Sequence, residues 1–211
     1  MDDDAHAEWV RALRLQTDTR DDAQTWRQKR TSFAVSLGNQ LTETVSGKVE
    51  ISSSQPVVYG VWLSWGVLYV GQTLNGRRRL RDLPIGESHH LSNTFPPEIW
   101  AKVGVVAWQM LPGGQEAADG MGAALVGKCL EYLLQRDRNP LVNAAARNRV
   151  GDFMPVDHAS SRSVAALRSG EIADLYSELR TRWDQIDAAA DPTQSPDPAV
   201  RIVFPGSERS N

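Results

Sequence analysis

Four side chains of complementary chemistry occur along the middle of the chain: Tyr59, Tyr69, Arg79 and Glu131. Cleavage of a phosphodiester needs an in-line nucleophile, stabilisation of charge on the phosphate oxygens and help for the leaving oxygen. A tyrosine can position or deprotonate water, an arginine fork matches phosphate oxygens, and one or two carboxylates suffice to hold Mg2+. Asn143, twelve residues after Glu131, would orient Glu131 or a tyrosine through its side-chain amide. These residue types predict phosphodiester cleavage.

Short secondary-structure elements are expected to position these residues. Residues 57–63 and 67–70 are rich in β-branched, aromatic and aliphatic side chains and flank a turn at 64–66, which predicts two paired strands. Asn75 is expected to cap a helix that carries the arginines and stops at Pro84. Residues 102–111 predict a third strand and residues 116–136 a helix weakened by glycines. The predicted order is strand, strand, helix, strand, helix.

The two flanks of this unit are predicted to be mainly helical. A short apolar segment near Trp9 precedes a longer helix whose stripe includes Trp26, Phe33 and Leu37. Towards the other end, apolar residues repeat at helical spacing over 164–186, with an interruption at 169–170, so this face needs burial against the core or another subunit. Residues 189–211 are rich in Pro, Ser and Asp and predict a loose tail, in which 200–204 is a candidate edge strand.

The composition of the chain limits the possible classes of protein less strictly than the motifs do. The chain has 211 residues, 41% of them hydrophobic, enough for one compact domain with extensions. Its formal net charge of −3 argues against a protein that coats nucleic acid through bulk charge but allows a local basic cleft. A single cysteine, Cys129, excludes an internal disulfide framework and a cysteine-based zinc cluster. The first residues have no signal-peptide pattern and no apolar run is long enough to span a bilayer, so a cytoplasmic protein without membrane contact is expected.

The spacing of the motifs resembles the GIY-YIG nuclease family. The family's first two strands carry the GIY and YIG triplets, and residues 57–59 and 69–71 occupy those places here. The catalytic arginine of the family stands eight residues past the second triplet, which corresponds to Arg79. A helical glutamate binds the metal in the family, with a proline and an asparagine commonly following at offsets of nine and twelve, as Glu131, Pro140 and Asn143 do here. The resemblance covers about residues 56–143 and implies an α/β fold with a small three-stranded antiparallel sheet and flanking helices.

The chain departs from the family pattern in the first triplet and at a histidine. The first triplet lacks its glycine, and about one residue is missing between the triplets. Many members have a histidine four residues past the arginine, where this chain has Leu83, and His89 or His90 is the candidate to take that place. Three candidates for the general base remain, with Tyr59 first, then Tyr69, then a histidine.

The resemblance also implies cofactor, partners and domain organisation. The chain looks most like the small type II restriction endonucleases of the family, with Mg2+ (or Mn2+ as a substitute) held by Glu131, double-stranded DNA as substrate and a homodimer as the symmetric assembly. We divide it into a helical extension at 1–55, a catalytic domain at 56–150, a second helical extension at 151–188 and the tail at 189–211. Arginines near the predicted site are the candidates for DNA binding: Arg77, Arg78, Arg81, Arg136, Arg138, Arg147 and Arg149.

Two other functions remain as alternatives. A non-catalytic DNA-binding or regulatory protein could keep the fold after its site has decayed, as the altered first triplet and the missing histidine suggest. A nuclease specific for modified DNA or for RNA would use the same catalytic residues on a different substrate. The recognition sequence cannot be deduced, because base contacts depend on geometry in the groove rather than on composition.

Overall fold

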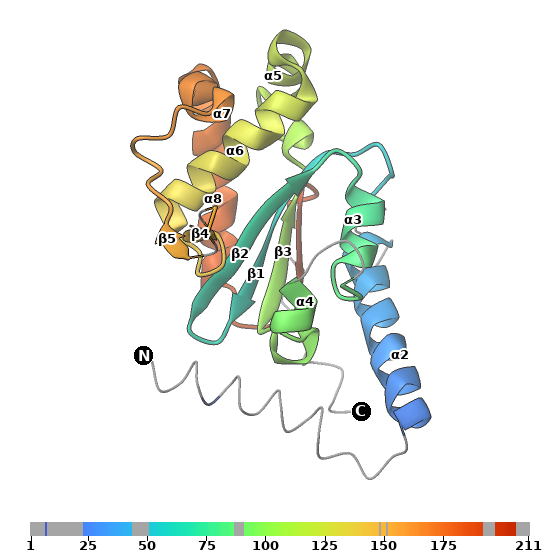
Figure 1. Cartoon of the computed structure of the whole chain (residues 1–211). Coiled ribbons are helices and arrows are strands. Elements are labelled where there is room, and N and C mark those ends of the chain that lie inside the picture. Colours follow the sequence, from blue (N-terminus) through green and yellow to red (C-terminus); the bar gives the residue numbers. More distant parts are fainter. Residues whose placement is uncertain are drawn as a thin grey trace.

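The computed structural model describes residues 7, 23–43, 51–86, 91–147, 149–150, 152–191 and 197–205. These residues form an α/β fold in which helices cover both faces of a four-stranded antiparallel sheet (Figure 1). The strands are β1 (Val57–Leu63), β2 (Gly66–Thr73), β3 (Lys102–Val106), β4 (Ala145–Arg147), β5 (Phe153–Pro155) and β6 (Val200–Val203). The α-helices are α2 (Ala23–Thr42), α3 (Gly76–Asp82), α4 (Leu91–Thr94), α5 (Gly114–Met121), α6 (Ala123–Arg138), α7 (Val164–Arg168) and α8 (Ala173–Ala188). Three 3-10 turns complete the list: η1 (Pro97–Ile99), η2 (Trp108–Met110) and η3 (Ser169–Ile172).

The main sheet has four strands in the order β2-β1-β3-β6. The prediction of a three-stranded sheet was therefore wrong by one strand. The fourth strand comes from the segment predicted as a loose tail, where Val200–Val203 pairs antiparallel with β3, from Val106↔Val200 to Val103↔Val203. This pairing is favourable because β3 would otherwise present unpaired backbone groups along an open edge. The candidate edge strand at 200–204 is therefore confirmed.

The sheet has two faces of different composition. Alternation along the strands puts Tyr59, Val61, Tyr69, Val103 and Val105 on one face, which we call the tyrosine face and which packs under α2 and α3. The opposite tryptophan face carries Val58, Trp62, Val70 and Val106 and packs under α6 and α8. Figure 1 shows α6 and α8 on one side of the sheet and α2 and α3 on the other.

The predicted hairpin and its helix are confirmed. β1 and β2 pair antiparallel around a turn at 64–65, and β2 extends beyond the predicted strand, to Thr73. The side chain of Asn75 accepts a hydrogen bond from the backbone N–H of Arg78 (3.1 Å), which is the N-cap expected for α3. The helix ends at Asp82, two residues before Pro84.

The next two predicted elements have different boundaries. The expected strand over 102–111 ends at Val106, and Trp108–Met110 forms a 3-10 turn instead. The expected helix over 116–136 is two helices, α5 and α6, separated at Gly122. Gly122 has a positive φ of +83°, which glycine adopts at little cost and other residues rarely do, so the chain changes direction between the two helices.

The helical flanks are confirmed in part. In α2, Leu37 and Leu41 are buried as the predicted stripe requires, while the segment near Trp9 lies outside the described residues. The C-terminal helices break at 169–170 as predicted, and the apolar face of α8 packs on the core of this same chain. The extension predicted as helical at 151–188 also contains β5, which pairs with β4. None of the helices in the described part of the chain is both long and apolar enough to cross a bilayer.

Candidate active site at the outer edge of strand β2

The outer edge of β2 is covered by α6 and by the segment that follows it. The backbone N–H of Val142 donates to Leu68 (2.9 Å). The Asn143 side chain accepts from the backbone N–H of Val70 (2.8 Å), and the Gln135 amide donates to the Val70 carbonyl (3.3 Å). These contacts satisfy strand groups that would otherwise be open to solvent or to another chain. Asn143 thus fixes the segment after α6 against β2, and its amide bonds this backbone group rather than Glu131 or a tyrosine, which corrects the role predicted for it.

Glu131 projects from α6 to the same edge. Its carboxylate accepts a hydrogen bond from the backbone N–H of Gln72, the next outward-facing N–H after that of Val70. Burial raises the pKa of Glu131 to about 7, although Arg79, the Gln72 N–H and Lys128 each lower it. A cation close to such a carboxylate stabilises its ionised form, so the interaction between the two is favourable.

Tyr59 and Tyr69 lie diagonally across the β1–β2 pair. Tyr59 is opposite Gly71 and Val61 is opposite Tyr69, so both tyrosines are on the tyrosine face with ring centroids 6.0 Å apart. A Cβ atom at Gly71 would come within 2.8 Å of the Tyr59 hydroxyl and 2.7 Å of the Tyr69 ring. The glycine that ends the second triplet therefore makes room for both rings.

The two tyrosines differ in exposure. Tyr59 is fully buried, and its hydroxyl has no hydrogen-bond partner of good geometry, although the Tyr69 hydroxyl lies close enough to affect its pKa. Burial raises the pKa of Tyr59 well above its usual value. The pKa of Tyr69, which is 8% exposed, is raised by burial and by Glu131 and lowered by Tyr59 and Arg79. Tyr69 is therefore the tyrosine nearer to solvent.

Arg79 completes this group from α3. Its side chain is half-buried, and its positive charge lowers the pKa values of Tyr59, Tyr69 and Glu131 together. A charge that acts on all three groups lies close to each of them. The structure thus brings together four predicted site residues that are separated by up to 72 positions in the sequence (from Tyr59 to Glu131).

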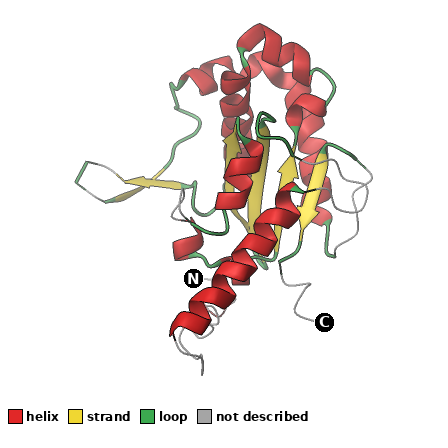
Figure 2. Ribbon diagram, turned by 90° about the vertical axis from the view of Figure 1, so that its right-hand side faces the viewer, coloured by secondary structure: helices red, strands yellow, loops and turns green. Residues whose placement is uncertain are grey.

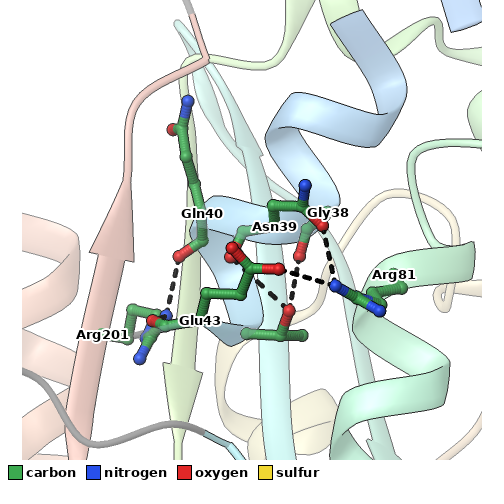
Figure 3. Close-up of polar contacts among 7 residues, drawn as sticks. Gly38, Asn39, Gln40, Glu43, Arg81 and Arg201 are labelled. Atoms are coloured by element: carbon green, nitrogen blue, oxygen red, sulfur yellow. Dashed lines mark hydrogen bonds and ion pairs between the residues drawn. The ribbon is translucent and has the colours of Figure 1, made fainter. Parts of the chain in front are cut away.

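Several predicted DNA-binding arginines have partners within the protein. Arg81 pairs with Glu43 (2.7 Å) and donates to Asn39 (3.0 Å), which joins α3 to the end of α2 (Figure 3). In the same view the buried Arg201 of β6 donates to the backbone carbonyls of Gln40 and Glu43. Arg81 and Arg201 therefore contribute to the packing of α2.

The other predicted arginines differ in their surroundings. Arg138 pairs with Asp184 and Asp187 on α8, and Arg136 pairs with the neighbouring Asp137. On α3, Arg77 is half-buried and Arg78 exposed, and Arg149 is exposed beyond β4. His89, His90 and the side chain of Arg147 lie outside the described residues.

Two glutamines at the site were not predicted from the sequence. Gln135 lies four residues after Glu131, one helical turn further along α6, so its position on the same helix face was available as a signal. Gln72 follows the second triplet, and its side-chain oxygen is buried without a partner opposite Gly127, where a Cβ atom would be 2.8 Å away. No sequence pattern distinguished Gln72 from an ordinary strand residue.

The donor set of the site fits one hard cation. Among the residues that the structure describes, no group of three or more His, Cys, Asp or Glu side chains could hold a metal ion. Mg2+ needs only one or two carboxylates and takes its other oxygens from water and substrate phosphates. Glu131, with a charge that burial makes costly, is a suitable single ligand.

Comparisons of the chain with protein-family models, with curated proteins and with solved structures gave no match.

Proposed function

We propose that this protein is a metal-dependent DNA endonuclease of the GIY-YIG type. The observation that carries the proposal is the convergence of Tyr59, Tyr69, Arg79 and Glu131 between the β1–β2 pair, α3 and α6. These are the residues whose spacing resembles that family, and they supply the groups that phosphodiester hydrolysis requires. An arrangement maintained only for packing would have no need to place a carboxylate and a guanidinium beside two buried phenols.

Each of these residues has a separate proposed role in phosphodiester hydrolysis. Arg79 binds the non-bridging oxygens of the phosphate, because its planar donors match their geometry. Tyr69 is the tyrosine that a water molecule can approach, and Tyr59 lies behind it, so water is positioned by Tyr69 with support from Tyr59. Asn143 and Gln135 hold α6 against β2, which sets the distance of Glu131 from the tyrosines.

Glu131 is the residue that would hold the metal ion, Mg2+ or Mn2+. When bound, the ion supplies positive charge for the phosphate and for the leaving oxygen. Leu83, at the place where many members of the family have a histidine, is fully buried in the core. Burial raises the pKa of both tyrosines, so each hydroxyl is protonated and orients the attacking water rather than taking its proton. His89 and His90, the remaining candidates for the base, lie outside the described residues.

Double-stranded DNA is the proposed substrate, and the proposed role of the protein is that of a restriction enzyme or a related defence enzyme. Arg78 is exposed on the helix that carries Arg79, and Arg149 is exposed on the segment that follows Asn143. Both lie on elements that adjoin the site, where phosphates on either side of the scissile bond would pass.

Incubation of the protein with varied plasmids, with Mg2+ and with EDTA, tests this function. We expect discrete fragments with Mg2+, none with EDTA, and none from the Glu131→Ala variant, which should still bind DNA. Glu116→Ala, on the first turn of α5, is the matched control and should cut normally. Cleavage by Glu131→Ala with added Mg2+ would show that the site is assigned wrongly. Binding without cleavage on ordinary and modified plasmids alike would favour a non-catalytic DNA-binding protein, and cleavage of modified DNA or of RNA alone a nuclease of different specificity.

A further inference from the structure

Strands β4 and β5 form a separate two-stranded sheet that projects from the body of the protein. Ala145 pairs with Pro155 and Arg147 with Phe153, and in the described part of the chain neither strand joins the main sheet. Figure 2 shows this β4–β5 hairpin extending away from the helices and the central strands. An isolated two-stranded hairpin is marginally stable in water, so one that stands clear of the core is expected to have a partner.

The projecting part exposes apolar side chains beside a cation. Val150 is 82% exposed and Met154 is 52% exposed, while Arg149 is exposed between β4 and Val150. Between 145 and 155 the sequence has two arginines and one acidic residue, Asp152. The hairpin is therefore locally positive in a chain whose formal net charge is −3.

The base of the hairpin is fixed to the edge strand of the candidate site. Leu141 and Val142 donate backbone hydrogen bonds to the β2 carbonyls of Val67 and Leu68, and Ala145 begins β4 three residues after Val142. The backbone N–H of Val156 donates to the carbonyl of Ala144 (2.8 Å), which closes the base of the hairpin. Strand β2 thus carries the base of the hairpin at Val67 and Leu68 and the contact with Glu131 at Gln72.

We infer that the β4–β5 hairpin is a DNA-binding element that enters the major groove of the duplex beside the cleavage site. This inference rests on the proposed nuclease function. The major groove admits a two-stranded β-ribbon, and its depth is about 8.5 Å. β4 and β5 have three residues each, a length of roughly 10 Å at the rise of a strand, which is comparable with that depth.

The side chains suit that environment. The guanidinium of Arg149 matches either a phosphate or the two acceptors of guanine, and an apolar side chain such as Val150 contacts the methyl group of thymine. Two arginines within three positions, against a single acidic residue, match the phosphate backbone of a duplex, and a second copy of this chain is the alternative that the test separates. The hairpin thereby contributes sequence discrimination, while Arg79 and Glu131 act on any phosphodiester.

The test uses the full chain with the paired substitution Arg149→Ala and Val150→Ala, which removes exposed atoms only. The matched control is Arg180→Ala with Val164→Ala, an exposed arginine on α8 and an exposed valine on α7. Binding is measured by fluorescence anisotropy on labelled plasmid restriction fragments, in the Glu131→Ala background so that nothing is cut. Cleavage is measured in parallel with Mg2+ and intact Glu131.

We expect the hairpin variant to bind about 10- to 100-fold more weakly, as the loss of one or two base contacts predicts, and to cut with relaxed sequence preference. Its affinity should also depend less steeply on salt, while the control pair matches the unchanged protein. Unchanged affinity and fragment pattern in the hairpin variant would overturn the inference and leave the nuclease function standing. DNA binding that depends on the hairpin, in a protein that cuts no nucleic acid, would support the inference and reject the nuclease function. A dimer that dissociates in sedimentation when the hairpin is changed, with DNA affinity per subunit retained, would assign the hairpin to subunit contacts and overturn the inference.

Discussion

The two faces of the sheet bury tyrosines in different ways. On the tryptophan side, Tyr176 of α8 is 8% exposed and its hydroxyl donates to the Asp137 carboxylate (2.6 Å). On the tyrosine face, Tyr69 is exposed to the same fraction and Tyr59 is fully buried. The Tyr59 hydroxyl has no partner of good geometry and lies among Tyr69, Arg79 and Glu131.

This difference concerns the hydrogen bond of each buried hydroxyl. A buried hydroxyl contributes to stability when it donates to an acceptor, because burial without a hydrogen bond costs desolvation free energy that nothing offsets. Tyr176 meets that requirement and Tyr59 does not. Tyr59, unlike Tyr176, lies beside Tyr69, Arg79 and Glu131, and on this ground the proposed function assigns it a role.

Removal of Arg79 should have the largest effect on activity. We expect Arg79→Ala to lower the cleavage rate by at least about 10³-fold, since an arginine that stabilises phosphoryl charge contributes this much or more. Arg78→Ala, the exposed neighbour on the same helix, should weaken DNA binding a few-fold and leave the rate at saturating DNA unchanged. Single-turnover cleavage at several enzyme concentrations separates rate from binding. Equal losses in the two variants would mean that Arg79 contributes only to DNA affinity.

Truncation on the tryptophan face should instead reduce stability. Trp183 is fully buried, its ring lies 5.2 Å from that of Trp62, and Gly60 lets it lie directly against β1. We expect Trp183→Ala to lower the free energy of unfolding by about 3–5 kcal/mol in urea titrations. Cleavage per folded molecule should remain normal at temperatures where the variant is folded. A variant that stays fully stable but loses activity would place the functional surface on the opposite face.

The site could be predicted from the sequence where its parts are local. Tyr69, Gly71, Asn75 and Arg79 lie within one strand–turn–helix segment, where turn residues, a capping asparagine and strand composition all act over a few positions. The spacing from Glu131 to Asn143 is also local, because one helix and its C-terminal turn set it. These local rules were sufficient to select residues that the fold then brings together.

The parts that depend on distant segments could not be predicted in the same way. Whether Val200–Val203 joins β3 depends on competition for a sheet edge between residues about 100 positions apart. Gln72 is placed by the approach of α6 at Gly127, and nothing in its own neighbours indicates that contact. The ion pairs of Arg81 and Arg138 also depend on residues of distant segments, so the sequence alone did not show that these two arginines are held within the protein.

The smallest expected effects provide the most direct comparison of the two faces. Tyr59→Phe removes a buried hydroxyl without a good partner, so the free energy of unfolding should not fall and should rise by up to about 1–3 kcal/mol. Its cleavage rate should fall about 10²-fold if the hydroxyl supports the base, the lower end of what a general base contributes. Tyr176→Phe removes a hydrogen bond to a carboxylate, which should cost about 1.5–3 kcal/mol in urea unfolding and leave cleavage unchanged. If Tyr59→Phe also lost only stability, Tyr59 would be a packing residue, and Tyr69 alone would remain as the tyrosine at the scissile phosphate.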